Sequence, residues 1–260
     1  MNRVLDTKYD KYGDYCAAQS LLEPLEWNFK SHPDFTYMTE HTNKTLGDSY
    51  LKQIMSEFSK IFYENRKYLL TCIEENDKYG KTTKYDHNNL ITCNSSNIRY
   101  IYQSLKICSY IKSLNLNNID FIEIGGGYGG LCYYLHKISN LFDIKISSYS
   151  IFDLEKPGLL LNKYLKTLNI DNVNIYTLDH IDNITLKTDS FLVSTYAFSE
   201  LVSNIRNEYQ KLVIEPYTSH GFIAWNGCEP YNFTKNGNIK VIDNFYTLDL
   251  KQKQFPYILF

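Results

Sequence analysis

The feature that most constrains the fold is a cluster of glycines, Gly125–Gly130 with Tyr128 among them, directly after a short apolar run. The run, residues 119–124, predicts a buried strand, and residues 131–138 predict a helix. Glycines allow a tight turn and a close approach of the backbone to a ligand, and free N–H groups at a helix start attract an anionic group. The cluster therefore predicts an α/β fold with a ligand-binding loop after its first strand.

The chain downstream of the glycine cluster alternates between short apolar runs and amphipathic segments. Alternation of this kind is typical of parallel strands joined by crossover helices. It predicts a Rossmann-like sheet of about seven mostly parallel strands flanked by helices. Further strands are expected over 145–152, 173–178, 191–195, 222–225, 239–242 and 257–260. One helix is expected with Pro157 in its first turn and its end at Leu168, and another from Ala197 to Val202.

The first 115 residues are different, because they predict helices and contain no convincing strand. Within 46–63, apolar residues recur at helical spacing from 50 to 62, and Gly47–Ser49 just before them supplies N-cap chemistry; the same spacing recurs over 97–114. The polar stretch 74–89 predicts a loop. We therefore expect a helical N-terminal cap over 1–115 and a Rossmann-like ligand-binding domain over 116–260.

Composition limits the partners and the compartment. With 27 basic and 29 acidic residues in 260, no positive excess is available for a phosphate backbone, so nucleic acid is not the expected partner. No run approaches the roughly 18 apolar residues that span a bilayer, and the N-terminus lacks a signal-peptide core. The six cysteines contain no C-x-x-C pair, which argues against a disulfide framework and a zinc knuckle. These observations predict a reduced, cytoplasmic protein.

The glycine cluster fits two ligand-binding patterns. Gly125, Gly127 and Gly130 satisfy the dinucleotide pattern G-x-G-x-x-G, whereas Glu123 with the same first glycines satisfies an acid-x-G-x-G pattern. About 135 residues follow Gly125, which is tight for two mononucleotide-binding halves and a substrate domain. An acidic residue two positions before the first glycine also suits a cationic amine, such as the amino group of S-adenosylmethionine (SAM).

A second acidic residue, Asp153, ends the second expected strand. A carboxylate at this position can accept hydrogen bonds from both hydroxyls of a ribose. The alternative is that Asp153 caps the helix that follows. Glu123 and Asp153 together favour a nucleoside ligand.

The sequence at this point resembles the class I SAM-dependent methyltransferases, and the wider pattern resembles the sugar O-methyltransferase family. The resemblance implies that Glu123, Gly125, Gly127 and Asp153 bind SAM and that the helix with Arg99 and Tyr100 closes over its methionine end. Tyr128, Leu154, Asp179 and Ser194 complete the implied cofactor contacts, although Ser194-Thr195 stands where Asn-Thr is expected. The resembling stretches are Tyr37–His41, Gly47–Leu51, Asn97–Tyr100, Ile122–Gly129, Phe152–Leu154, Ser194–Leu201 and Phe222–Asn226.

Methylation of a hydroxyl benefits from a general base within hydrogen-bond reach. Four residues are candidates: Glu200 after the fourth strand, His180 after the third, His41 in the cap and, least favoured, His220. Each has an alternative role, since Glu200 can stabilise a helix start and His180 can lie in an exposed turn. His220 precedes the fifth expected strand and should lie at the opposite edge of the sheet.

Two further alternatives concern metal binding and stacking. Asp179 and Asp182 form the best pair of carboxylates for a divalent ion, but no third ligand follows the fourth strand, so we expect no metal. Tyr128 and Trp225 could stack on adenine or a sugar, and both also fit ordinary packing.

The expected function is SAM-dependent O-methylation of a sugar hydroxyl, on a nucleotide-activated sugar or a surface-polysaccharide precursor. Three alternatives stay open: methylation of a non-carbohydrate group on a glycan, such as a phosphorus-linked group; an NAD-dependent oxidoreductase; and a catalytically silent SAM-binding protein. The expected partner is a small-molecule or nucleotide-sugar acceptor, and self-association is left open.

Overall fold

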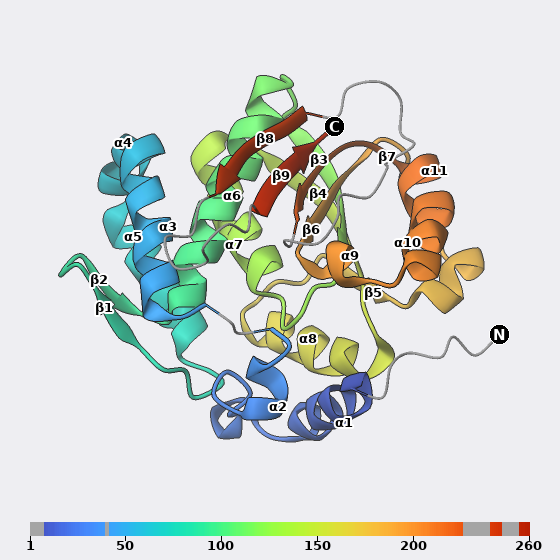
Figure 1. Ribbon diagram of the computed structural model, residues 1–260, viewed down its shortest axis with the longest axis horizontal. Helices are drawn as coiled ribbons and strands as arrows, with labels where there is room; N and C mark the ends of the chain where they lie inside the picture. Colours follow the sequence, from blue (N-terminus) through green and yellow to red (C-terminus); the bar gives the residue numbers. More distant parts are fainter. Residues whose placement is uncertain (1–7, 40–41, 226–239, 246–254) are drawn as a thin grey trace. The chain divides into compact units, whose positions relative to one another are not determined.

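A computed structural model describes residues 8–39, 42–225, 240–245 and 255–260, and the chain divides into two compact units (Figure 1). The helical unit comprises Met1–Tyr110, Gly127–Phe142 and Leu154–Asp171. The sheet unit comprises Ile111–Gly126, Asp143–Asp153 and Asn172–Phe260. The domain boundary near residue 115 that the sequence indicates stays a prediction.

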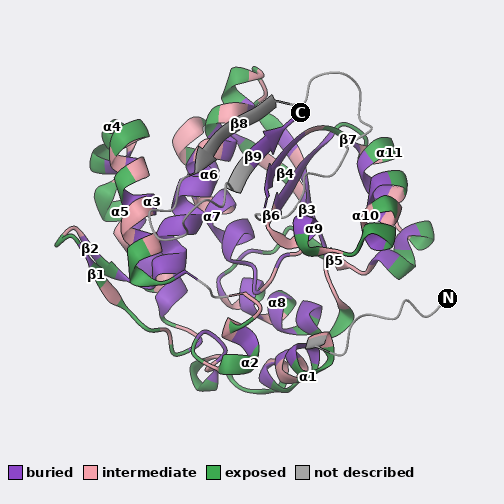
Figure 2. Cartoon of the chain, viewed as in Figure 1, coloured by how far each residue is buried: buried purple, intermediate pink, exposed green. Residues whose placement is uncertain are grey.

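The sheet unit contains a seven-stranded sheet in the order β5-β4-β3-β6-β7-β9-β8. Strands β5, β4, β3, β6 and β7 are parallel, and β9 is antiparallel to both β7 and β8, so the predicted sheet is confirmed. Strands β3 and β6 are buried over most of their length (Figure 2). The bounds are β3 (Asn118–Ile124), β4 (Lys145–Phe152), β5 (Val173–Tyr176), β6 (Ser190–Thr195), β7 (Thr218–Ala224), β8 (Lys240–Phe245) and β9 (Phe255–Leu259).

The strand order creates a topological switch point between β3 and β6. The chain enters the sheet at β3, moves outward through β4 and β5, and returns to the other side of β3 as β6. In open α/β sheets the crevice at the carboxyl ends of such neighbouring strands binds ligands. Short helices follow these ends: η3 (Leu178–Asn183) after β5 and α9 (Ala197–Glu200) after β6.

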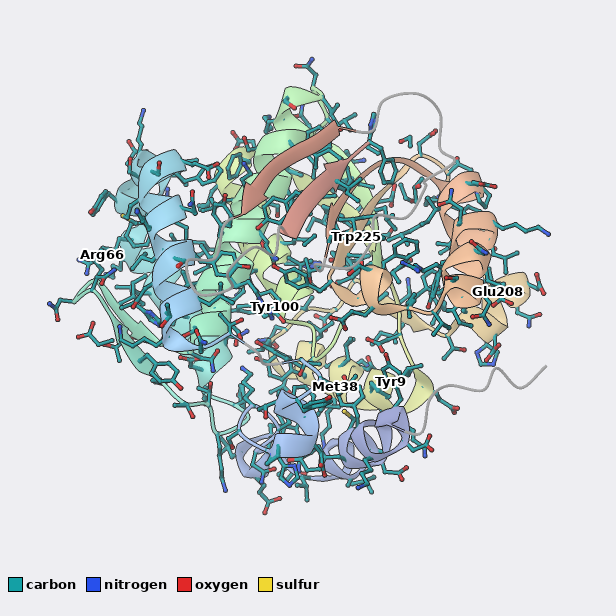
Figure 3. The ribbon with its side chains drawn as sticks, viewed as in Figure 1. Tyr9, Met38, Arg66, Tyr100, Glu208 and Trp225 are labelled. Atoms are coloured by element: carbon teal, nitrogen blue, oxygen red, sulfur yellow. The ribbon has the colours of Figure 1, made fainter. Side chains whose placement is uncertain are left out.

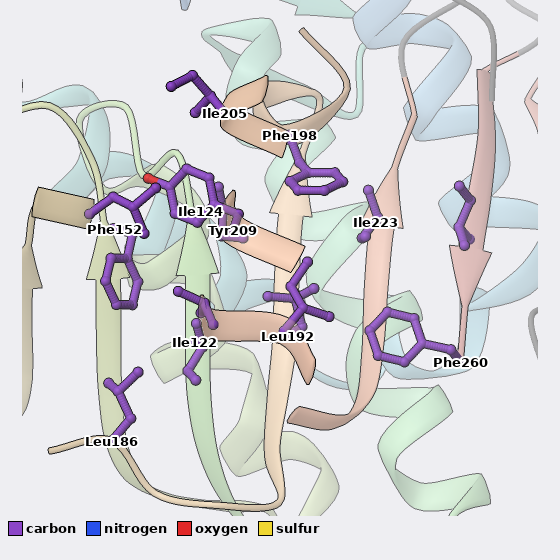
Figure 4. Packing of buried hydrophobic residues seen from close by; sticks show 14 of the residues in the cluster. Ile122, Ile124, Phe152, Leu186, Leu192, Phe198, Ile205, Tyr209, Ile223 and Phe260 are labelled. Atoms are coloured by element: carbon purple, nitrogen blue, oxygen red, sulfur yellow. The ribbon is translucent and has the colours of Figure 1, made fainter. Parts of the chain in front are cut away.

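One face of the sheet is covered by apolar side chains of the same unit. Ile122 and Ile124 of β3, Leu192 of β6 and Ile223 of β7 project into a common core (Figure 4). The helical segments α10 (Ser203–Tyr209), η4 (Gln210–Ile214) and α11 (Glu215–Tyr217) contribute to the same cluster. Removal of these side chains from water holds the strand ends in place.

The helical unit contains most of the helices and one small sheet. Helix α6 begins in this unit, and its last residues belong to the sheet unit. None of the helices in the described part is long and apolar enough to cross a membrane. The elements are α1 (Lys8–Leu21), η1 (Pro24–Glu26), α2 (Pro33–Thr36), α3 (Lys44–Glu57), α4 (Ser59–Glu64), α5 (Arg66–Asp77), β1 (Tyr85–His87), β2 (Ile91–Cys93), α6 (Ser95–Ser113), α7 (Gly130–Ile138), η2 (Ser139–Phe142) and α8 (Glu155–Thr167).

Two expectations about the first helix are corrected. The helix expected over 46–63 is divided at Phe58 into α3 and α4. It also begins earlier than Gly47–Ser49, because the side chain of Asn43 is the N-cap and accepts a hydrogen bond from the N–H of Leu46 at 2.9 Å. Asparagine at an N-cap satisfies a donor that the helix leaves without a partner.

The expected loop over 74–89 is also partly wrong. Helix α5 continues to Asp77, whose buried carboxylate accepts hydrogen bonds from the backbone of Asn94 and the side chain of Asn97. Strands β1 and β2 then form an antiparallel hairpin, although no strand was expected here. Three residues, 88–90, connect the two strands, and Asn88 and Asn89 both have positive φ, at 56° and 57°. The N–H of Leu90 donates to the carbonyl of His87 at 3.1 Å and closes the turn.

Candidate functional site

Gly125 begins the glycine loop at the carboxyl end of β3, in the sheet unit. Its φ is +79°, and a Cβ built on it would lie 2.1 Å from the Cβ of Ala197, the first residue of α9. Its N–H donates to the carbonyl of Phe152 at the end of β4. The turn therefore excludes a side chain both by its backbone conformation and by the space that α9 leaves.

Glu123 lies two residues before this turn and is 1% exposed. Its carboxyl accepts a hydrogen bond from the hydroxyl of Tyr149 on β4 at 2.8 Å. Burial raises the pKa of Glu123 to about 8; the Tyr149 bond lowers it and the charge of Asp153 raises it. Burial therefore favours the protonated form of Glu123 in the free protein, and a cation beside it would favour the ionised form.

Asp153 follows β4, as predicted, and is partly exposed at the carboxyl end of the sheet. Its N–H donates to the carbonyl of Tyr176, the last residue of β5. The alternative role as a helix cap is wrong, because Leu154 is the N-cap residue of α8 and no side chain caps that helix.

Ser194 lies on β6 and is fully buried. Its hydroxyl donates to the carbonyl of Ile124 at 2.7 Å and accepts from the N–H of Phe198 at 3.1 Å. The side chain thus joins the end of β3 to the start of α9, and direct contact with a cofactor stays a prediction.

Tyr196, which connects β6 to α9, has a positive φ of 72°, a backbone conformation that residues other than glycine rarely adopt. Its N–H donates to the carbonyl of Ala224, and its own carbonyl accepts from the N–H groups of Ser199 and Glu200. These bonds hold the turn at the switch point. Glu200, a candidate base, is exposed on α9 in the same turn.

The remaining sheet-unit candidates lie after β5 or on β7. Asp179 and His180 are exposed on η3, where Nδ1 of His180 lies 2.9 Å from the hydroxyl of Thr177. His220 lies within β7 opposite Phe191, because that strand begins at Thr218 instead of Phe222. His41 lies outside the described residues.

Metal binding gains no support from the arrangement of side chains. Within the described ranges, no group of three His, Cys, Asp or Glu could hold a metal ion. Asp179 and Asp182 both lie on η3.

In the helical unit, the second half of the glycine loop contacts α6. A Cβ on Gly130 would lie 2.4 Å from the ring of Tyr100, labelled in Figure 3. Arg99 stacks on that ring at 4.7 Å, and its Nη2 lies 3.5 Å from the carbonyl of Thr39. A Cβ on Gly127 would lie 3.7 Å from Cγ2 of Thr39. Thr39, Arg99 and the loop thus form one cluster.

The rings considered for stacking are inside the protein. Tyr128 is 1% exposed and packs against Phe29 and Tyr164, with the ammonium of Lys30 at 4.7 Å from its centre. Trp225, labelled in Figure 3, is 1% exposed in the sheet-unit core. Both rings therefore have packing roles. A contact between a cofactor and the backbone of Tyr128 stays a prediction.

No protein-family model and no curated protein matches this sequence. Among solved structures, it is similar to the N-methyltransferase NodS of Bradyrhizobium japonicum in complex with S-adenosylhomocysteine (SAH), with 11% sequence identity and a TM-score of 0.37. That match covers 50% of this chain and 62% of the NodS chain. It is also similar to a SAM-dependent methyltransferase from Aquifex aeolicus, with 14% sequence identity and a TM-score of 0.38. That match covers 61% of this chain and 97% of the other. The match to YcgJ of Bacillus subtilis has 14% sequence identity and a TM-score of 0.36, and it covers 48% of this chain and 51% of that chain.

These likenesses concern the fold alone. The match covers less than two thirds of the NodS and YcgJ chains.

Proposed function

We propose that this protein is a SAM-dependent methyltransferase that methylates a hydroxyl group of a sugar. The observation that carries the proposal is the turn at Gly125, which lies at the switch point of the sheet and is closed by Ala197. Partly exposed Asp153 ends the adjacent strand. A glycine turn beside a carboxylate at this edge suits a nucleoside ligand.

Each chemical part of SAM has a matching group in the chain. The carboxylate of Asp153 would accept from the ribose hydroxyls, and the ionised form of Glu123 would attract the ammonium group. The guanidinium of Arg99 would pair with the carboxylate of the methionine end, because it presents several donors to an acceptor-only group. When bound, SAM supplies a methyl group on a positively charged sulfur.

The chain must then orient the acceptor and remove its proton. Methyl transfer depends mainly on alignment, and a hydroxyl is a poor nucleophile until a base accepts its proton. Glu200 is the favoured base, because it is exposed and lies in the turn that α9 makes against Gly125. His180 lies after β5, at an outer edge of the sheet, and is the second candidate.

The acceptor rests on the family resemblance alone. A nucleotide-activated sugar or a surface-polysaccharide precursor would fit it, in a protein of the cytoplasm. A phosphorus-linked group on a glycan is the alternative acceptor.

Calorimetric titration with SAM, SAH and NAD tests the cofactor. We expect SAM and SAH to bind and NAD not to bind. Asp153→Ala should lower the affinity for SAH by about tenfold or more, since it removes hydrogen bonds between a charged group and the ribose. Asp171→Ala, at an exposed aspartate outside the glycine loop and the strand ends, is the matched control.

The other outcomes identify the alternatives. Binding of NAD alone would overturn the proposal and return the glycine cluster to a dinucleotide site. Binding of SAH without transfer of label from SAM to any nucleotide sugar or glycan would favour the catalytically silent protein.

A further inference from the structure

Lys30, between η1 and α2 in the helical unit, is a buried lysine among aromatic rings. It is 3% exposed, and its Nζ lies 4.7 Å from the centre of the Tyr128 ring and 5.0 Å from that of the Tyr164 ring. The ring of Phe29 lies at 5.9 Å. The face of an aromatic ring attracts a cation over such distances. Because a buried charge is unfavourable without compensation, these contacts and the hydrogen bonds of the ammonium group have to hold it.

The hydrogen bonds fix the ammonium group of Lys30 in one position. Its Nζ donates to the carbonyl oxygen of Asn76 at 2.5 Å, to Oδ1 of the same residue at 2.7 Å and to the hydroxyl of Tyr164 at 2.9 Å. These acceptors are as many as the N–H donors of an ammonium group. Asn76 belongs to the last turn of α5, where the helix dipole favours a positive charge. The buried charge therefore has a defined place beside the ring of Tyr128.

Tyr128 is the one residue of the glycine loop that has a side chain, since every other position of 125–130 is glycine. Gly127 and Gly129, on its two sides, have positive φ of 56° and 95°. Glycine has the most backbone freedom to lose when it becomes ordered, so a loop that is already ordered binds a ligand at a lower entropic cost. The buried ring of Tyr128 is thus the only side chain that can anchor this loop.

We infer that Lys30 is a positioning residue: through the ring of Tyr128 it holds residues 127–130 of the glycine loop in the conformation that binds the cofactor. This inference rests on the proposed function, in which the loop binds SAM. Lys30 acts on the ring and not on the ligand. Its charge raises the affinity because the loop is ordered before the ligand arrives.

The test compares Lys30→Met with Lys163→Met. Lys163 is the matched control in the same unit, because its Nζ also donates to carbonyls at the end of a helix, those of Ser20 at 3.1 Å and Leu22 at 2.6 Å. It also lies 6.0 Å from the centre of a ring, that of Trp27, which is outside the glycine loop. Both variants should lower the melting temperature, since they leave carbonyls without a donor.

Calorimetric titration with SAH, at a temperature where both variants are folded, separates the two lysines. Lys30→Met should lower the affinity for SAH by about three- to thirtyfold, the range expected for loss of a contact between a cation and a ring. Lys163→Met should leave the affinity within about twofold of the wild type. Lys30→Gln, which removes the charge and keeps N–H donors for Asn76, covers the case in which Lys30→Met does not fold, and it should show the same loss.

A double-mutant cycle tests whether Lys30 acts through Tyr128. Tyr128→Leu removes the ring, so adding Lys30→Met to it should lower the affinity for SAH no further. A role in stability alone would not produce this dependence.

Three outcomes would overturn the inference: unchanged SAH affinity in the folded Lys30 variants, equal losses in Lys30→Met and Lys163→Met, or additive losses in the cycle. If the wild-type protein does not bind SAH, the proposed function fails and the positioning role fails with it. If the wild-type protein binds SAH and one of the three outcomes is observed, only the role of Lys30 fails.

Discussion

The Cβ of Ala197 occupies the space where a side chain on Gly125 would begin, with 2.1 Å between the two positions. This contact joins the loop after β3 to the helix after β6. The two sides of the switch point are thereby fixed to each other, and the position of Glu200 depends on the glycine.

Gly125→Ala should destabilise the protein and abolish SAH binding. The left-handed backbone alone costs about 1–2 kcal/mol for a residue with a Cβ, and displacement of α9 adds to this. Urea unfolding and SAH titration measure the two effects. Gly125→Ala with Ala197→Gly should recover part of the stability, because the second change removes the clash and leaves the backbone cost; a double variant no better than the single one would contradict this.

The long strands could be predicted because each contains buried apolar residues, although none is apolar throughout. Strand β4 has the expected bounds, and β6, with the run Phe191–Val193 at its centre, begins one residue early. The hairpin of β1 and β2 was missed because each strand has only three residues. Its only signal was the pair Asn88-Asn89.

The candidate site could be predicted only as far as single positions along the chain. Gly125 and Asp153 were recognisable from their place after expected strands. The partner of Glu123 was not, because Tyr149 is 26 positions away and meets it only through strand pairing.

The titration of Glu123 should make stability depend on pH. Burial raises the pKa of Glu123 to about 8 in the folded protein, against the ordinary value of 4.5, so folding retains a proton that the unfolded chain releases between these values. The contribution to stability is complete below about pH 4.5 and is lost as the pH rises through about 8.

Glu123→Gln imitates the protonated form and should remove this dependence. Melting temperatures of the two proteins should be similar at pH 5, and the variant should be the more stable at pH 8.5. A melting series over this range measures the difference. Curves that stay parallel would show that Glu123 does not titrate as its burial indicates.

Asp48, His87 and Ser95 form a chain of contacts in the helical unit that resembles a nucleophilic triad. Nδ1 of His87 lies 2.7 Å from Asp48, and Nε2 lies 3.3 Å from the hydroxyl of Ser95. His87 and Ser95 are both 0% exposed, and Gly47 leaves no space beside them. This series of side-chain contacts therefore has a structural role, since it connects α3, the β1–β2 hairpin and α6.

His87→Phe should therefore destabilise the protein by roughly 2–4 kcal/mol, because Asp48 and Ser95 lose a buried partner. SAH affinity should stay within about twofold of the wild type at a temperature where the variant is folded. Ser95→Ala is the control for nucleophilic chemistry and should not change methyl transfer. Loss of transfer in a stable Ser95→Ala protein would mean that the triad takes part in the reaction.

The two candidate bases can be separated by kinetics. Glu200→Gln should lower kcat by about 10²–10⁴-fold, the usual contribution of a general base, and leave SAH affinity unchanged. His180→Ala should lower kcat by less than about tenfold, because η3 follows the strand at the outer edge of the sheet. Transfer of radiolabelled methyl groups from SAM to a panel of nucleotide-activated sugars provides the assay. A large loss of kcat in His180→Ala together with a small loss in Glu200→Gln would assign the base to His180.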